Sequence, residues 1–319
     1  MTEAVDLAPP GRKWFRLPLR LVKWLAVGVL VFVPLYYLGG ALLLHEIDDD
    51  PKLELPADAT GSRAVAMAAA LLDREINGHA WVANDPWFLP GAVLDNMPNY
   101  QQGVVQALAR FAFTLADQLG RLRGSSQTDN DLQRAAGQLQ YPGTIWVFDL
   151  SSSFLPTESS ESRYQGARKA LLAYNARLAR GEAVLDRRAD NLQAALDRVA
   201  LDLGASSAAI EQHIAQHSGQ FLDARADNLF YGVKGQLYAY SLLLRELGQD
   251  FANVVKDREL AAVWQEMLAS LVTAAALQPL VVVNGVPDSQ WQPSHLAAQG
   301  FYLLRARTKL REITTILEK

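Results

Sequence analysis

The stretch from Trp24 to Leu44 contains no charged residue, and nearly all of its 21 side chains are apolar. A helix of this length spans about 30 Å, which matches the hydrocarbon thickness of a bilayer. We therefore expect a transmembrane helix over residues 24–45. The bilayer is then the first predicted partner, through residues 24–44, and every other segment is interpreted by the side of the membrane on which it lies.

The charges on either side of this stretch predict its orientation. Basic residues remain on the cytoplasmic side of a membrane. This predicts a cytoplasmic tail over residues 1–23, an acidic leader over 46–61, and a periplasmic domain over 62–319, with the helix in a bacterial inner membrane. The basic residues before the stretch are Arg12, Lys13, Arg16, Arg20 and Lys23, and the acidic residues after it are Glu46, Asp48, Asp49 and Asp50.

Two other interpretations of the apolar stretch remain. A cleaved signal peptide also has a basic start and an apolar centre, but its apolar segment is shorter, and Gly39-Gly40-Ala41 is only a weak cleavage site. The other alternative is a buried helix of a soluble core. Pro34 removes one backbone donor and is expected to bend the helix locally.

The composition beyond the anchor limits the possible functions. From Glu46 onward the chain has 25 Lys and Arg residues against 32 Asp and Glu residues. A net negative surface gives no electrostatic reason to bind nucleic acid. Cysteine is absent, and a domain of this size does not need disulfides because its core can be large. Both features fit a periplasmic protein.

Repeated helical patterns predict a mainly α fold. The clearest covers residues 162–217, where apolar residues recur every seven positions and predict a seam that faces a partner helix. Gly181 is expected to weaken this region, and Gly204 is expected to end one helix before another begins. Several such seams predict an elongated antiparallel helical bundle. The recurring residues are Leu171, Leu178, Leu185, Leu192 and Val199.

Two irregular regions interrupt the helices. Residues 78–99 hold three prolines and two tryptophans, which is typical of an ordered, packed loop and is also compatible with a binding surface. Thr144–Phe148 and Leu280–Val283 are rich in β-branched residues. We therefore expect that these two segments pair as a small two-stranded β element.

Four strings carry a resemblance to a known family. They are SRAVAMAAALLDREIN (62–77), ANDPWFLPGAVLDNMPNYQQG (83–103), LFYGVKGQLYAY (229–240) and HLAAQGFYLLRARTKLREI (295–313). The chain resembles the DUF2333 family of uncharacterised proteobacterial membrane proteins. The resemblance implies an inner-membrane protein with a periplasmic helical domain. It implies no reaction and no catalytic residue.

Four residues are candidates for acid–base or nucleophilic catalysis: His79, Asp85, Asp95 and Lys234. Each also has a structural interpretation. A histidine at a helix C-terminus commonly interacts with the helix dipole, and aspartates beside prolines commonly form Asx-turns. Lys234 would act as a nucleophile only if burial lowered its pKa. No sequence motif of a hydrolase, a nucleotide site or a dinucleotide site is present, so we expect no cofactor.

His213 and His217 are four residues apart, so one helical face can present both imidazoles to a metal ion. Zinc enzymes with this spacing also need an intervening glutamate and a third ligand. Here the intervening residues are Ile214, Ala215 and Gln216. We therefore favour a solvated helix end over a metal site.

Two hypotheses about function follow from these patterns. The first is a membrane-anchored interaction or scaffold protein with a protein partner in the cell envelope. The second is a periplasmic enzyme or ligand-binding protein that acts on an envelope polymer or lipid. The second predicts a cleft where the loop at 79–100 meets the helix at 227–240. Convergence of the four candidate residues in such a cleft would favour it.

Overall fold

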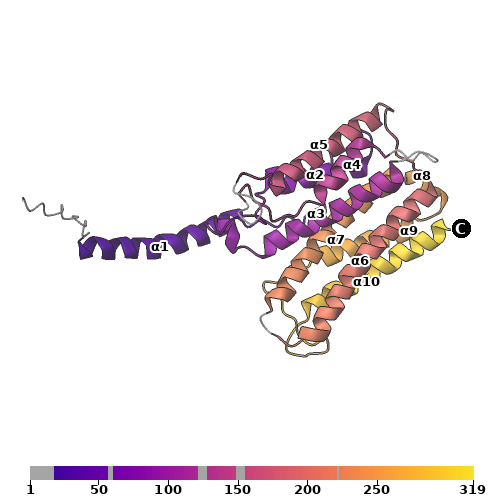
Figure 1. The fold of residues 1–319 in the computed structure, drawn as a ribbon. Helices are drawn as coiled ribbons and strands as arrows, with labels where there is room; N and C mark the ends of the chain where they lie inside the picture. The colour runs from indigo at the N-terminus through magenta and orange to yellow at the C-terminus, as the bar shows by residue number, and fades with distance from the viewer. Residues whose placement is uncertain (1–17, 57–59, 121–127, 149–154, 221–222) are drawn as a thin grey trace, which may run out of the picture.

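The computed structural model describes residues 18–56, 60–120, 128–148, 155–220 and 223–319. A long helix, α1 (Leu19–Leu44), projects from one end of a helical body, and the C-terminus lies at the opposite end (Figure 1). Most of the predicted cytoplasmic tail, residues 1–17, lies outside the described residues. The helix begins at Leu19 rather than at Trp24, so Arg20 and Lys23 belong to its first turns.

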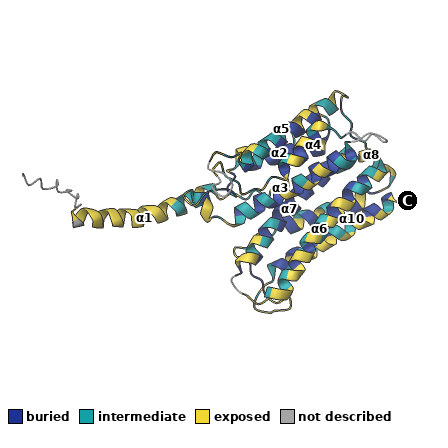
Figure 2. Ribbon diagram, viewed as in Figure 1, coloured by how far each residue is buried: buried dark blue, intermediate teal, exposed yellow. Residues whose placement is uncertain are grey.

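Helix α1 is long and apolar enough to cross a membrane, and it alone meets that test in the described ranges. None of its most apolar 18-residue window is buried against the rest of the chain, which argues against a core helix. Figure 2 shows the helix exposed over most of its length and partly covered where it meets the body. Pro34 lies inside the helix, as the sequence requires.

The body is a bundle of helices in two groups, which confirms the predicted mainly α class. Helix α3 packs along α7 and joins the groups (Figure 1). In the first group α5 packs on α2 and α4, and in the second α10 packs on α6 and α9. The first group comprises α2 (Arg63–Asp73), α3 (Asn96–Thr114), α4 (Asn130–Leu139) and α5 (Ser160–Ala179). The second comprises α6 (Ala189–His217), α7 (Ala224–Asp250), the short α8 (Ala252–Asp257), α9 (Ala261–Ala275) and α10 (His295–Leu317).

Three short helical segments complete the fold. Two are π-helical turns that continue longer helices: η1 (Arg74–Gly78) extends α2, and η3 (Leu115–Leu119) extends α3. The third, η2 (Pro90–Val93), is a 3₁₀ turn that packs against α1. Isolated π turns occur often at functional sites. The site described below begins at η1.

Glycines allow α3 and α7 to approach closely. A Cβ at Gly103 would collide with the backbone oxygen of Gly232, and a Cβ at Gly235 would collide with the backbone oxygen of Tyr100. Both glycines lie at the crossing of the two helices, so backbone packs against backbone there. The absence of side chains at these two positions thus sets the distance between the two groups of helices.

Helix ends follow the local sequence at most of the predicted positions. Ser62 accepts a hydrogen bond from the backbone of Val65, as expected of a helix N-cap. Gly181 has a φ of 74° and ends α5, so the predicted weak point is confirmed. The predicted helix end at Gly204 is wrong, because α6 runs through it without a break. There the side chain of Arg307 lies against Gly204, and tertiary packing outweighs the local Gly-Ala-Ser-Ser signal.

The expected pairing of Thr144–Phe148 with Leu280–Val283 is also wrong. The backbone of Val147 accepts a hydrogen bond from the backbone of Thr157 at 2.7 Å, so the first segment bonds to its own loop. The second segment ends at Asn284, which forms isolated bridges to Gln220 and Ser294. No β-strand occurs in the part of the chain that the structure describes. Composition alone does not determine which segments pair.

Candidate functional site

A buried ion pair connects the acidic leader to the centre of the bundle. The ammonium group of Lys234 on α7 lies 2.6 Å from Asp49 Oδ2, and it also donates to the backbone oxygens of Ala275 at 2.5 Å and Leu277 at 2.8 Å. The Lys234 side chain is 1% exposed. Gln278 donates to both carboxylate oxygens of Asp49. Every hydrogen of the ammonium group therefore has an acceptor inside the protein.

These contacts shift the pKa values of both partners. Burial lowers the pKa of Lys234, although the hydrogen bond to Asp49 and the charge of Asp49 oppose this shift. Burial alone would raise the pKa of Asp49, but hydrogen bonds from Gln278 and Lys234 outweigh it and lower that pKa. An ionised pair is the consistent description, because the ammonium group has only hydrogen-bond acceptors around it.

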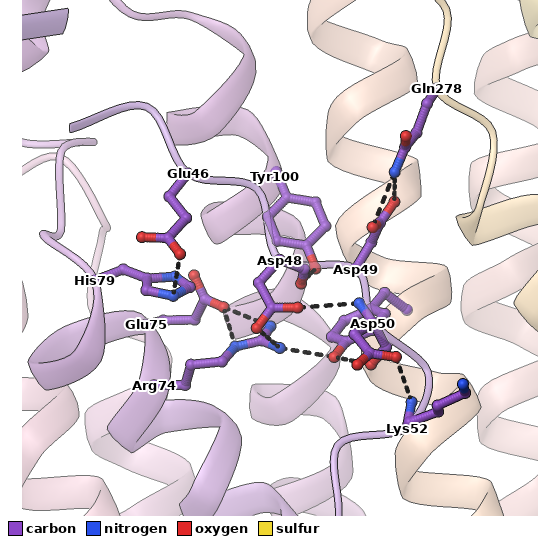
Figure 3. A network of polar contacts seen from close by, with 11 residues as sticks. Glu46, Asp48, Asp49, Asp50, Lys52, Arg74, Glu75, His79, Tyr100 and Gln278 are labelled. Atoms are coloured by element: carbon purple, nitrogen blue, oxygen red, sulfur yellow. Dashed lines mark hydrogen bonds and ion pairs between the residues drawn. The ribbon is translucent and has the colours of Figure 1, made fainter. Parts of the chain in front are cut away.

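A second polar cluster surrounds Arg74, beside the first (Figure 3). The guanidinium group contacts Glu75 at 2.7 Å, Asp48 at 3.3 Å and the hydroxyl of Tyr238 at 2.7 Å, and it lies 4.9 Å from the centre of the Tyr238 ring. Tyr100 donates to the backbone oxygen of Asp48 at 2.6 Å. Burial opposes the charge of Arg74, but the adjacent Glu75 carboxylate outweighs it and raises the pKa of Arg74. The cluster thus holds a second residue of the leader.

The π turn η1 positions the residues of this cluster. The backbone N–H of His79 bonds to the oxygen of Arg74, which closes the wide turn. Glu75 points inward and is 1% exposed, and one of its carboxylate oxygens has no hydrogen-bond partner in the described residues. His79 follows the turn, with its Nε2 3.6 Å from Glu46 Oε1 (Figure 3). A regular α-helical turn would rotate these side chains away from the leader.

The leader runs along α7 in the direction of the helix. Its successive segments contact residues of increasing number on α7. Asp49 bonds to Lys234, Asp50 accepts from Tyr238, Pro51 and Leu53 accept from Arg245, and Ser62 donates to Asp250. Leader and helix are therefore joined at several points along about four turns of α7.

The structure places the four candidate catalytic residues in separate surroundings. His79 faces Glu46 and Lys234 is paired with Asp49. Asp95 accepts a hydrogen bond from the Asn96 backbone at the start of α3, so it caps that helix. Asp85 lies under Gly91, where burial and the charge of Glu161 raise its pKa to about 6. No hydrogen bond or ion pair joins any two of the four in the described part of the chain.

The acidic leader occupies the position where the second hypothesis placed a cleft. Tyr100, which lies in the first turns of α3, and Tyr238 of α7 have their ring centres 6.1 Å apart, and both donate to the leader backbone. The leader residues Asp48 and Asp49 were not predicted as site residues. Arg74, which contacts Asp48, and Glu75, which contacts Arg74, were not predicted either. The sequence feature that could have indicated these residues is the charged Arg74-Glu75 pair at the end of an apolar helix. The sequence alone does not show which residues this pair contacts.

The two histidines considered for a metal site stack on each other. The ring centres of His213 and His217 are 4.7 Å apart. The Nε2 atom of His213 lies 2.7 Å from a carboxylate oxygen of Asp223, so this ring nitrogen already has a hydrogen-bond partner. Within the described ranges, no group of three or more His, Cys, Asp or Glu residues is arranged to hold a metal ion.

An open groove lies between α3, the end of α4 and α6. Its volume is about 660 Å³. Arg110 and Arg198 lie on its rim, with side chains 61% and 50% exposed, and each has an acidic neighbour, Asp202 and Asp117. The groove also contains Gln102, Gln106, Gln140, Phe113 and Tyr141. Its mixed lining suits a polar or acidic ligand better than a purely apolar one.

The fold and the site together define a class: an α-helical protein whose described residues include one helix long and apolar enough to cross a membrane, with a leader that hydrogen bonds and ion pairs join to a helical body. Residues 44–224 match the DUF2333 family, which is described as an uncharacterized protein conserved in bacteria. The match covers more than half of the chain, so the protein belongs to this family, as the resemblance implied. No curated protein and no solved structure is detectably similar to the chain.

Proposed function

We propose that the protein is a membrane-tethered interaction or scaffold component of the bacterial cell envelope. In this proposal α1 crosses the inner membrane with its N-terminus in the cytoplasm. The helical body lies in the periplasm and binds another envelope protein. We assign no reaction to it.

The observation that carries the proposal is the joint between α1 and the body. A simple tether needs only a flexible linker, but here the linker is fixed by Lys234 and Arg74, two cations that the bundle largely buries. Breaking the buried pair of Lys234 and Asp49 costs about 3 kcal/mol or more. The pair of Arg74 and Asp48 contributes less, because the Asp48 carboxylate is partly exposed. The joint therefore holds the body in one orientation relative to α1. A fixed orientation favours binding to a partner that is held in the same membrane.

The chemistry of the site supports a structural role for these charges. The Lys234 ammonium group directs its hydrogen bonds to protein oxygens. The Arg74 guanidinium group contacts the Glu75 carboxylate and Tyr238, which supplies both its hydroxyl and its ring. Catalytic groups must reach a substrate. These two reach the leader, which connects the membrane helix to the body.

Photo-crosslinking in intact cells tests the proposal. A photoreactive amino acid replaces one exposed residue on each of three faces: Gln106 on α3, Lys169 on α5 and Glu312 on α10. We expect one face to give a single abundant adduct with another membrane or periplasmic protein, and the other two faces to serve as its controls. Absence of a protein adduct from all three faces, together with turnover of cell-wall or lipid material by the purified protein, would overturn the proposal.

The groove favours a second candidate function, a ligand-binding protein for an envelope lipid or polymer. The two arginines on its rim suit an anionic group such as a phosphate. We expect native mass spectrometry of the full chain, purified in detergent, to detect a bound anionic molecule. The double variant Arg110→Ala, Arg198→Ala should lose that molecule, and the same added mass above each polypeptide, or no added mass on either, would argue against this function.

A further inference from the structure

Four aromatic side chains, three exposed and one half-buried, form a continuous ledge on the body. Trp87 contacts Phe88, Phe88 contacts Trp146, and Trp146 contacts Phe148, with ring centres 5.7, 5.5 and 5.6 Å apart. Two loops that are distant in the sequence supply the rings. Trp87 is 80% exposed, Phe88 42% and Phe148 51%. Clustered apolar surface of this kind marks a contact with a partner or a membrane.

Hydrogen bonds fix the ledge beside α1. The hydroxyl of Tyr36 donates to the backbone oxygen of Phe88 at 3.1 Å, and the hydroxyl of Tyr37 donates to that of Trp87. Two residues after Phe88, Pro90 packs on Gly40 so closely that a Cβ at Gly40 would collide with it. The ledge is thus attached to α1 before the helix ends at Leu44.

The length of α1 indicates how deep in a membrane the contacts between α1 and the ledge would lie. Arg20 and Lys23 lie before the uncharged stretch, but their long side chains can extend back to the inner headgroups, so the hydrocarbon core can begin at Arg20. A core of about 30 Å that begins there corresponds to 20 residues and ends near Gly40. Tyr36 then lies about 6 Å inside that boundary. The loop that carries Trp87 and Phe88 therefore reaches the level of the membrane boundary and does not stand clear of it.

We propose that the aromatic ledge lies in the headgroup region of the outer leaflet and is a second membrane contact of the protein. Tryptophan and tyrosine are the residues that prefer this layer, because they present an apolar ring and a polar atom together. The inference rests on the proposed crossing of the membrane by α1. It adds that the body lies against the bilayer through Trp87, Phe88, Trp146 and Phe148.

The absence of cysteine makes a matched test possible. Single cysteines replace Val93 in η2 and Val147 between two ledge rings, with Val31 in α1 and Thr315 in the last turn of α10 as references. All four positions are exposed, and α10 ends at the far end of the body from α1 (Figure 1). The full chain carries an environment-sensitive fluorophore at one site and is reconstituted in phosphatidylethanolamine–phosphatidylglycerol vesicles. Brominated acyl chains then quench a label that contacts lipid.

We expect blue-shifted, quenched emission at positions 31, 93 and 147, and unquenched emission at 315. Quenching at 31 with water-like emission at 93 and 147 would overturn the inference and leave the anchor intact. Water-like emission at 31 as well would overturn both the inference and the anchor. A photoreactive group at Val147 that captures a protein instead of lipid in native membranes would also overturn the inference, because the ledge would then be a protein interface.

Discussion

At the scale of the single residue, Lys234 links the leader that follows α1 to the core. It lies in the middle of an apolar helical pattern, where the sequence offers a structural and a catalytic interpretation. The structure favours the first, because the ammonium group pairs with Asp49, 185 residues earlier in the chain. A contact at this separation leaves no local signal, so the sequence predicted the candidate and not its partner.

The substitution Lys234→Met should destabilise the protein by about 3 kcal/mol, because it leaves the Asp49 carboxylate half-buried without its cation. Urea unfolding of the full chain in detergent, followed by circular dichroism, measures the loss. The double variant Lys234→Met, Asp49→Asn should recover part of it, with a coupling of more than about 1 kcal/mol. Additive losses in the double variant would show that the two side chains act independently.

Asp85 predicts a pH dependence of stability. Burial, followed by the charge of Glu161, raises its pKa in the folded protein to about 6 from 3.8. A raised carboxyl pKa means that the folded state binds the proton more tightly than the unfolded state does. The stabilising contribution is complete below pH 3.8 and is lost as the pH rises through 6.

The substitution Asp85→Asn should therefore stabilise the protein at pH 7.5 by about 1 kcal/mol, a value reduced for the partial exposure of the group. At pH 4 the gain should nearly vanish. Urea midpoints at both pH values measure the difference, with Asp288→Asn on an exposed loop as the control. A gain that is the same at both pH values would contradict the assignment.

At the scale of the element, helix α7 is the centre of the molecule, and its crossing with α3 depends on glycine. Gly103→Ala places a Cβ against the backbone oxygen of Gly232, which belongs to α7 and has little freedom to move. We expect a loss of about 2 kcal/mol or more in the free energy of unfolding, because overpacking forces helices apart.

A matched control for this change lies in α4. A Cβ at Gly137 meets nothing within 4 Å, so Gly137→Ala should stabilise that helix by about 0.5 to 1 kcal/mol. Urea unfolding compares the two variants under one set of conditions. Equal effects of the two substitutions would mean that helix propensity, and not the approach of α3 to α7, determines the outcome.

The helices themselves were largely predictable, while their ends and contacts were less so. Apolar periodicity predicted the positions of the long helices, and Ser62 and Gly181 end or begin helices as their chemistry requires. Gly204 and the proposed strand pairing failed for different reasons. Arg307, which is distant in the sequence, packs against Gly204. Val147 and Val283 instead bond to backbone near them in the chain, to Thr157 and His295.

At the scale of the whole molecule, the charges that flank α1 predict how the chain is oriented. Arg20 and Lys23 lie in its first turns, and Glu46 and Asp48 follow its end. A fusion of alkaline phosphatase after Lys319 should be active, since that enzyme folds only outside the cytoplasm, and a green fluorescent protein at the same place should be dark. The same two reporters fused before Met1 should give the opposite result. A bright C-terminal fusion would reverse the orientation.

The path of the acidic leader along α7 has a mechanical consequence. Because the leader follows the helix in one direction and is bonded to it from Lys234 to Asp250, a pull on α1 away from the body strains these contacts side by side. Bonds that share a force in shear rupture together and at a higher load than bonds that peel one after another. The attachment is therefore arranged to resist a pull that separates α1 from the helical body.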